Sequence, residues 1–284
     1  MTGDTTVTPL LLVDGHNLLW RAAFGFPAEI RSRDKTRVLT ATFGFFALLR
    51  VAIRDEISAR PEVIVVFDGQ YGAEGRRESD GEYKANRPAD GSGLAPIRAL
   101  PDVKVGLDAF EVAWVEIDDA EADDVIATLV AADPDRDTLI LSGDRDYYQL
   151  LTDHVHVLNT AMHPGKRHIG PDEVFARYGV TPGQWPCYRA LTGDSADNIP
   201  GVKGIGATTA AKLLADDLTL NDLPGSGRLV AAKGRAITQA WTQVLAWRDL
   251  IRLREDIHLP LKPTGLPSAA LPKPADIIER LGLW

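Results

Sequence analysis

LLLVDG at residues 10–15 is the stretch that decides the fold, because an apolar run there ends in an Asp-Gly pair. Two further apolar runs end in acids, VIVVFDG at 63–69 and LILSGDRD at 139–146. Continuous runs of this length are typical of strands covered on both faces of a parallel sheet. In such sheets ligands bind at the carboxyl ends of the strands, which is where these runs place Asp14, Asp68 and Asp144.

Helix and strand patterns alternate around these runs. Thr40–Ile53 has apolar residues at helical spacing, and Glu121–Ala132 also predicts a helix. Val112–Ile117 and Val155–Asn159 predict further strands. This alternation predicts an α/β fold with a central, mostly parallel sheet and helices on both faces.

The same patterns divide the chain into two parts. Residues 1–170 form the α/β part, which contains a connection at 70–106 rich in Gly, Arg, Lys and Asp. A connection of that length is usually functional or disordered. Residues 171–284 form a helical part, in which Trp241–Glu255 predicts a strong helix with arginines on its polar side.

The composition is that of a soluble globular protein, with 284 residues, 45% hydrophobic and 25% charged. A single cysteine, Cys187, excludes an internal disulfide and favours a reducing, cytoplasmic compartment. No apolar run approaches the roughly 20 residues that span a bilayer, so no membrane partner is expected. The net charge of −9 argues against a nucleic-acid partner, unless many of the acids hold cations.

Nine acids in the chain are candidates to hold such cations. Beside the three strand-end aspartates, EADD at 121–124 begins a helix, and GDSADNIPGVKGIG at 193–206 carries two acids before a Gly-rich turn. Singly, such acids are common in turns and at helix starts. Together they repel one another unless cations neutralise them, and all-oxygen sites suit Mg²⁺ or Mn²⁺. The expected ligands are Asp14, Asp68, Glu121, Asp123, Asp124, Asp144, Asp146, Asp194 and Asp197.

Two groups of acids suit a pair of metals about 4 Å apart, an arrangement that fits phosphodiester hydrolysis without a protein nucleophile. Cys187 has no His near it in sequence, and no G-x-S-x-G elbow is present. A structural α/β protein whose acids only cap helices is the alternative, and its stability would be indifferent to Mn²⁺.

Two basic segments add candidate phosphate contacts. RRESDGEYKANRP at 76–88 combines cations with an aromatic, as nucleic-acid binding requires, although its interleaved acids also fit a solvated loop. IPGVKGIGATTAAK at 199–212 predicts a tight turn into a helix start, where free N–H groups receive a phosphate. A hairpin used only for packing is the alternative there. The expected contacts in the second segment are Lys203, Gly204, Gly206, Thr208 and Lys212.

These motifs together resemble the bacterial 5′ nuclease, or flap endonuclease, family, which includes the N-terminal nuclease domain of DNA polymerase I. The resemblance covers about residues 10 to 215, and it rests on VDGHNLLWRA, VVFDG, R-x6-YKANRP, EADD, SGDRDYYQLL and GDSADNIPGVKGIG. It implies a PIN-like, resolvase-like fold with a helical arch and a helix–three-turn–helix element around 190–216. It also implies Mg²⁺- or Mn²⁺-dependent cleavage of 5′ flaps and 5′ ends, in primer removal and DNA repair.

The resemblance also assigns roles. Asp14, Asp68, Glu121, Asp123 and Asp124 resemble one metal group, and the other four acids resemble a second. Lys84 and Arg87 resemble cations that contact the scissile phosphate, with Tyr83 beside them and Arg21 near the active site. Arg76 resembles a phosphate-contacting arginine. The carbonyls of Val202 and Ile205 are expected to hold K⁺ or Na⁺.

The implied partners are flap, nicked or gapped DNA and RNA–DNA hybrids, bound by a monomer near the nucleoid. The segment after Pro88 is rich in Gly and Pro, so a fully helical arch is not expected. The chain ends at Trp284 without room for a polymerase, so a free-standing nuclease is expected. A PIN-type ribonuclease or a catalytically silent DNA-binding paralogue remains as an alternative. Such ribonucleases are shorter and lack the Gly-rich segment, and a silent paralogue would lack one acid group.

Overall fold

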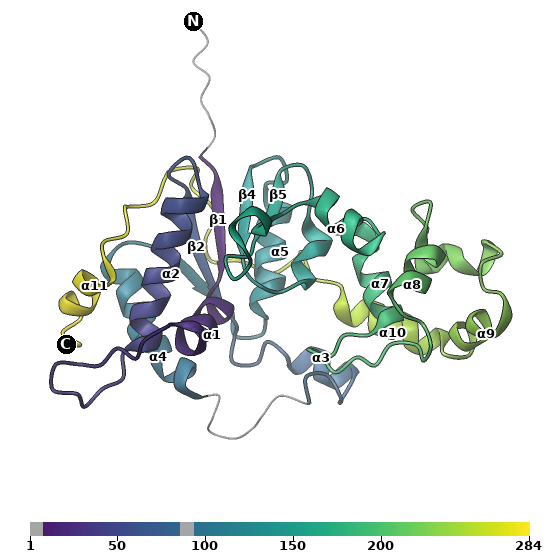
Figure 1. The fold of residues 1–284 in the computed structure, drawn as a ribbon, viewed down its shortest axis with the longest axis horizontal. Coiled ribbons are helices and arrows are strands. Elements are labelled where there is room, and N and C mark those ends of the chain that lie inside the picture. The colour runs from purple at the N-terminus through teal and green to yellow at the C-terminus, as the bar shows by residue number, and fades with distance from the viewer. Residues whose placement is uncertain (1–7, 86–93) are drawn as a thin grey trace, which may run out of the picture.

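The structure is a computed structural model that describes residues 8–85 and 94–284. Its core is a six-stranded sheet in the order β3-β2-β1-β4-β5-β6, in which every pair is parallel except β5 with β6 (Figure 1). The mostly parallel sheet expected from the sequence is therefore confirmed. The strands are β1 Leu10–Asp14, β2 Glu62–Phe67, β3 Ala113–Glu116, β4 Thr138–Leu141, β5 Val155–Leu158 and β6 His168–Ile169.

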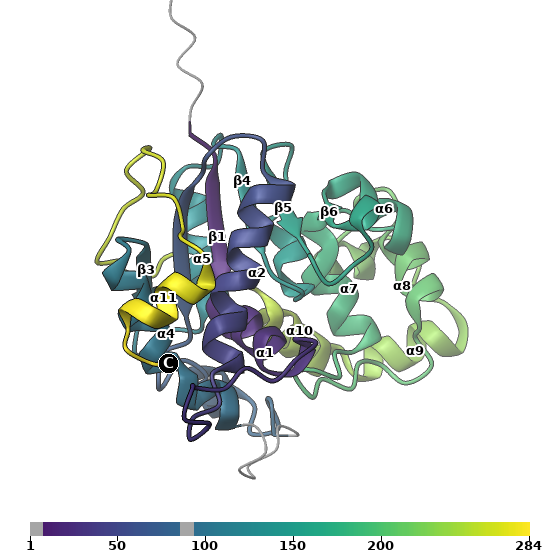
Figure 2. The same cartoon turned by 60° about the vertical axis from the view of Figure 1, so that its left-hand side comes forward.

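Helices cover both faces of the sheet (Figures 1 and 2). Leu11 and Val13 of β1 belong to the core on the face of α1, α2, α4 and α11, whereas Leu10 and Leu12 belong to the core on the face of α5. Burial on both faces explains why the strands are continuous apolar runs. The bounds are α1 Gly15–Gly25, α2 Thr40–Glu56, α4 Leu94–Ala109, α5 Ala122–Ala132 and α11 Pro274–Arg280.

The helical part lies beside the β6 edge of the sheet (Figure 2). Helix α7 packs against both α8 and α10, and short 3₁₀ segments join the helices. The bounds are α6 Pro171–Tyr178, α7 Trp185–Thr192, α8 Ala207–Leu214, α9 Ala231–Gln239 and α10 Trp241–Ile251, with the 3₁₀ segments η4 Pro182–Gln184 and η5 Leu220–Gly225 between them. Two further 3₁₀ segments belong to the sheet part, η2 Asp146–Leu150 after β4 and η3 Pro164–Lys166 after β5. In the part of the chain that the structure describes, no helix is long and apolar enough to cross a membrane.

Two segments differ from the sequence-based expectation. The 70–106 connection contains α3, Glu74–Ser79, and most of α4, whose Val103 is buried although Pro101 interrupts the helical pattern. The helix expected through Glu255 is α10, which ends at Ile251 because the chain becomes extended at Arg252 and turns towards the sheet. The first difference makes part of this connection a core element.

Candidate active site

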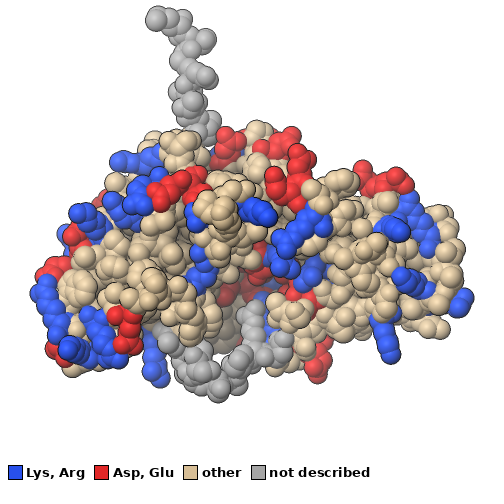
Figure 3. All heavy atoms as spheres, in the orientation of Figure 1, with Lys and Arg blue, Asp and Glu red and all other residues tan. Residues whose placement is uncertain are grey.

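The strand-end aspartates meet at one edge of the sheet. Asp14 is the last residue of β1, which lies between β2 and β4, and Asp68 and Asp144 follow those two neighbouring strands. The parallel register aligns Asp14 with Val66 of β2 and Val13 with Leu141 of β4, so the three strands end together. In the space-filling view, acidic side chains lie in a hollow between the sheet part and the helical part (Figure 3).

Asp14 is buried at the centre of this edge. One carboxylate oxygen accepts the N–H of Asn17 at 2.9 Å, and the other accepts the hydroxyls of Ser142 at 2.9 Å and Tyr147 at 3.3 Å. Burial, followed by the negative charge of Asp68, raises the pKa of Asp14 to about 7. A carboxyl in this state gains from a nearby cation, because a cation favours its ionised form.

Asp68 connects this edge to the start of α5. Its Oδ1 accepts the N–H of Ala122 at 2.8 Å, and its Oδ2 lies 3.4 Å from Nδ1 of His16. His16 in turn accepts the backbone N–H of Asp68 at 3.0 Å. Sequence analysis did not single out His16, although its place inside VDGHN was the available signal.

The start of α5 gathers acids and cations. Glu121 pairs with Arg76 and Lys84, and it accepts the hydroxyl of Tyr83 at 3.0 Å. Burial opposes ionisation of Glu121, but the charges of Lys84 and Arg76 outweigh it and lower the pKa of Glu121. Burial raises the pKa of Asp123, with Arg76 acting against it. Here the chain itself supplies positive charge to the acids.

Asp124 is the most enclosed of these acids, since its side chain is 0% exposed. Arg76 donates to Oδ1 at 2.7 Å, and the guanidinium of Arg254 lies 3.0 Å from Oδ2. Both oxygens of Asp124 are thus engaged by cations. Sequence analysis missed Arg254, because the helix expected through Glu255 placed it on a solvent-facing side.

The second acid group lies at the start of η2 and in the turn after α7. Asp144 accepts the N–H of Asp146 at 3.0 Å, and Asp194 accepts from Arg189 Nε at 3.0 Å. Oδ1 of Asp146 is buried and has no hydrogen-bond partner among the described residues. Burial raises the pKa of Asp146, and so do the charges of Asp144, Asp197 and Asp194.

Lys84 joins the two groups. Its side chain is 7% exposed, and its Nζ pairs with Glu121 while lying 3.8 Å from Asp197. Its backbone N–H donates to the carbonyl of Asp197 at 3.1 Å, and its φ of +53° lies in the left-handed region. The ring of Tyr83 lies beneath Lys84 Nζ at 4.8 Å. Lys84, in the segment of the expected arch, therefore lies between the two acid groups.

Of the other two cations expected in the site, the structure describes only Arg21. Arg21 lies on α1 and donates to the hydroxyl of Thr160 at 2.9 Å, and burial together with Arg167 lowers its pKa. Among the described contacts, Arg21 touches none of the nine acids. Arg87 lies outside the described residues.

The carboxylate oxygens of the nine acids suit hard divalent cations, but in this structure the acids do not surround a single point. Within residues 8–85 and 94–284, no group of three or more His, Cys, Asp and Glu side chains is arranged to hold a metal ion. The unpartnered oxygen of Asp146 and the raised pKa of Asp14 nevertheless mark carboxylates that a cation would stabilise. An all-oxygen set suits Mg²⁺ or Mn²⁺ rather than a soft metal.

The Gly-rich turn lies between α7 and α8. The N–H of Val202 donates to Leu191, the N–H of Ile205 donates to Val202, and both side chains are buried. Gly204 has a φ of +83°, which explains the glycine there. No side chain caps the start of α8, where Thr208 is exposed.

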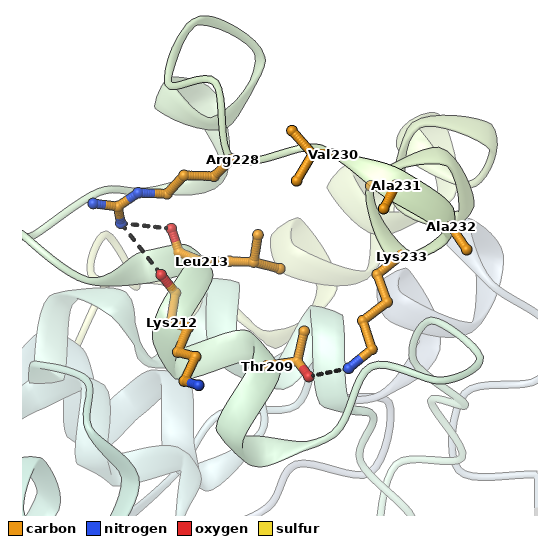
Figure 4. Close-up of a pocket in the computed structure, with 9 residues that line it drawn as sticks. Thr209, Lys212, Leu213, Arg228, Val230, Ala231, Ala232 and Lys233 are labelled. Carbon is orange, nitrogen blue, oxygen red and sulfur yellow. Dashed lines mark hydrogen bonds between the residues drawn. The ribbon is translucent and has the colours of Figure 1, made fainter.

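A basic groove of about 660 Å³ continues from α8 to α9 (Figure 4). Lys212 and Lys233 line it, and Lys233 donates to the hydroxyl of Thr209 at 2.8 Å. Arg228 lies at its edge and donates to the carbonyl of Leu213 at 3.0 Å, near the end of α8. Lys233 and Arg228 were missed by sequence analysis, because they follow the recognised motif.

Two family models match the chain. One, described as 5′-3′ exonuclease, N-terminal resolvase-like domain, matches residues 9–179, and the other, described as 5′-3′ exonuclease, C-terminal SAM fold, matches residues 180–273. The thermostable DNA polymerase I of Thermus aquaticus is 39% identical over 254 residues, which are 88% of this chain and 29% of that polymerase. DNA polymerase I of Mycobacterium tuberculosis is 34% identical over 93% of this chain and 29% of its own length. The chain thus spans less than a third of either relative.

Solved structures show the same fold. The bacteriophage T5 flap endonuclease, in a pseudo-enzyme–product complex with DNA and metal ions, has a TM-score of 0.67 at 22% identity, covering 85% of this chain and 88% of that chain. The catalytic core of Rad2 in complex with a DNA substrate has a TM-score of 0.58 at 14% identity, covering 97% and 87%.

Both family models describe domains of 5′-3′ exonucleases, which are a class of phosphodiester hydrolases. The chain belongs to the 5′-3′ exonuclease family, whose N-terminal and C-terminal models together match residues 9–273. The family and the enzyme class expected from the motifs are confirmed.

Proposed function

We propose that this chain is a divalent-metal-dependent, structure-specific nuclease that hydrolyses phosphodiesters at 5′ flaps and 5′ ends of duplex DNA. The observation that carries the proposal is that acids from the sheet part and acids from the helical part meet at one site. Asp144 and Asp146 follow a sheet strand, whereas Asp194 and Asp197 come from the helical part, and Lys84 lies between Asp197 and Glu121.

The nine acids form the proposed site for Mg²⁺ or Mn²⁺, eight of them as direct ligands and Asp124 as the buried acid that supports them. When bound, the ions supply an activated water and stabilise the leaving oxygen. Asp14, Asp68, Glu121 and Asp123 provide carboxylate oxygens at the sheet edge. Asp144, Asp146, Asp194 and Asp197 provide those of the second group. Asp124 belongs to the first group by position, although its oxygens are already engaged.

Lys84 has the proposed role of contacting the scissile phosphate. Its ammonium is held by Glu121, so it becomes available to a phosphate once other cations satisfy that carboxylate. Tyr83 donates to Glu121 and so fixes the orientation of this acid. Arg87 is proposed to act beside Lys84, and Arg21, which donates to Thr160, is proposed to act near the active site. Arg76 orients Glu121 and Asp124 and is a further candidate for a phosphate contact.

The α7–α8 turn and the basic groove are the proposed duplex-binding surface. Lys203, Gly204, Gly206, Thr208 and Lys212 lie along the turn and α8, and Lys233 extends this surface to α9. The carbonyls of Val202 and Ile205 are the proposed ligands of K⁺ or Na⁺. The substrates would be flap, nicked or gapped DNA, or RNA–DNA hybrids formed during primer removal and repair, bound by a monomer.

One gel tests the proposal. A 5′-labelled flap duplex is incubated with Mg²⁺, Mn²⁺ or EDTA, beside a matched 3′-flap duplex. We expect metal-dependent release of the 5′ flap and little cleavage of the 3′ flap. Equal cleavage of both flaps, or cleavage that persists in EDTA, would refute it. Faster cleavage of single-stranded RNA would favour a PIN-type ribonuclease instead, and metal binding without cleavage would favour a silent paralogue.

A further inference from the structure

A segment after α10 crosses from the helical part to the acid-bearing edge. This return segment, residues 252–257, makes hydrogen bonds with the elements that carry the acids. The N–H of Leu253 donates to the side-chain oxygen of Gln149 at 3.1 Å, and the amide of Gln149 donates to the carbonyl of Asp146 at 2.9 Å. The return segment is therefore bonded to the start of η2.

Arg254 makes the second link, to α5. Its backbone N–H donates to Oδ1 of Asp124 at 2.9 Å, and its Nε donates to Oδ2 at 3.0 Å. Its Nη2 also lies 3.0 Å from Oδ2 and donates to the carbonyl of Asp119 at 3.2 Å. A planar guanidinium can make this set of contacts, whereas a single ammonium cannot.

Arg76 extends this network of hydrogen bonds from Asp124 to Glu121. It donates to Asp124 at 2.7 Å, pairs with Glu121, and donates to the carbonyl of Leu250 at 3.1 Å. Asp124 thus helps to hold Arg76 in place, and Arg76 helps to orient Glu121 together with Lys84 and Tyr83. Helix α10, which leads into the return segment, packs against α7, which precedes Asp194.

We propose that Arg254 is a positioning residue, which holds Asp124 as a buried anchor and thereby orients Arg76 and Glu121 for catalysis. This inference rests on the proposed function. It gives Asp124 a supporting role, since both of its oxygens accept hydrogen bonds and its side chain is inaccessible to solvent. Residues that orient metal ligands typically contribute about 10- to 100-fold to metal affinity or activity.

The experiment compares Arg254→Ala and Arg254→Lys with Arg252→Ala. Arg252 is a matched control, because it is also exposed on the return segment but makes no side-chain hydrogen bond or ion pair with a residue that the structure describes. Three quantities are measured well below the melting temperature: the single-turnover rate on a 5′ flap in Mg²⁺, the Kd of the flap duplex in Ca²⁺, and the Kd of Mn²⁺ by EPR titration.

We expect Arg254→Ala to lower the rate and weaken Mn²⁺ binding, each about tenfold, with the duplex Kd changed less than about twofold. The cleavage rate and the Mn²⁺ affinity of Arg254→Lys should lie between those of Arg254→Ala and the wild type, because lysine keeps the positive charge but lacks the planar set of donors of a guanidinium. Arg252→Ala should leave the rate and Mn²⁺ binding near wild type.

Four results would overturn the inference. Arg254→Ala could match Arg252→Ala, it could bind Mn²⁺ more tightly because only a positive charge was lost, or its duplex affinity could fall as much as its rate. Full rescue by Arg254→Lys would also count against an orienting role. If the wild type fails to cleave the flap, the proposed function fails, whereas the Mn²⁺ titration still reports on Arg254.

Discussion

The start of α5 and the start of η2 both bury carboxylates at the same sheet edge, but the chain supplies cations mainly to the first. Glu121 is paired with Arg76 and Lys84, and its pKa is lowered. Asp146 has a buried oxygen without a partner among the described residues, and its pKa is raised. The comparison teaches that the fold itself supplies cations to Glu121, whereas Asp146 pairs with no cation among the described residues and would gain from cations in solution.

The largest effect is expected for Asp146→Asn. Loss of this proposed ligand should reduce 5′-flap cleavage about a thousandfold, which corresponds to about 4 kcal/mol of transition-state stabilisation. The same substitution should raise the melting temperature of the metal-free protein in EDTA, because it removes a charge that burial disfavours. Rates come from single-turnover cleavage, and stability from thermal unfolding.

The sign of that stability change follows from linkage. The native state binds the proton on Asp146 more tightly than the unfolded chain does, so the metal-free protein gains stability as the pH falls through the native pKa. Asp153→Asn is the control, because Asp153 is exposed and makes none of these contacts. Both variants remove one carboxylate, so a difference between their melting temperatures reports the effect of burying Asp146. If only Asp146→Asn lowered the melting temperature, the proposed difference between Asp146 and Glu121 would be contradicted.

Glu121→Gln should change stability in the opposite direction. It leaves Arg76 and Lys84 facing a neutral amide, and breaking a buried ion pair typically costs about 3 kcal/mol or more. Urea unfolding in EDTA measures this loss. If Glu121→Gln and Asp146→Asn shift the free energy of unfolding in the same direction, the two groups do not differ as described.

Mn²⁺ should stabilise the wild type by about 2.7 kcal/mol at a free concentration 100 times its Kd. Asp146→Asn should lose most of this gain, since Asp146 has the carboxylate oxygen that lacks a partner in the described structure. The measurement is the melting temperature in Mn²⁺ relative to EDTA. A wild type that is indifferent to Mn²⁺ would favour a purely structural role for the acids.

The sheet and the position of its acids could be predicted because apolar strands covered on both faces leave a direct signal in sequence. The partners of those acids could not. Arg254 reaches Asp124 only because α10 ends at Ile251, and nothing in the local helical pattern marks that end. Arg76 and Lys84 were expected to face a phosphate, yet the structure pairs them with Glu121. Contacts between residues so far apart in sequence depend on tertiary packing.

Lys84→Ala should slow the hydrolysis of a bound flap about tenfold or more, while the duplex Kd in Ca²⁺ changes less than about threefold. The reason is that its proposed partner is the reacting phosphate rather than the duplex. The variant also leaves Glu121 with one cation fewer. Equal losses of rate and duplex affinity would remove the proposed role, and Lys166→Ala, at an exposed lysine in η3, is the control for general charge.

The smallest effect is expected in the basic groove between α8 and α9. Lys233→Ala should weaken duplex binding several-fold at low salt and reduce the slope of log K against log[salt] by about one, because one phosphate contact is lost. Its hydroxyl partner, Thr209, carries no charge, so the ammonium remains available to a phosphate. Lys273→Ala, at a lysine beside α11, should leave the slope unchanged. An unchanged slope in Lys233→Ala would confine duplex binding to the α7–α8 turn, and an altered single-turnover rate would contradict the separation between the groove and the acid groups.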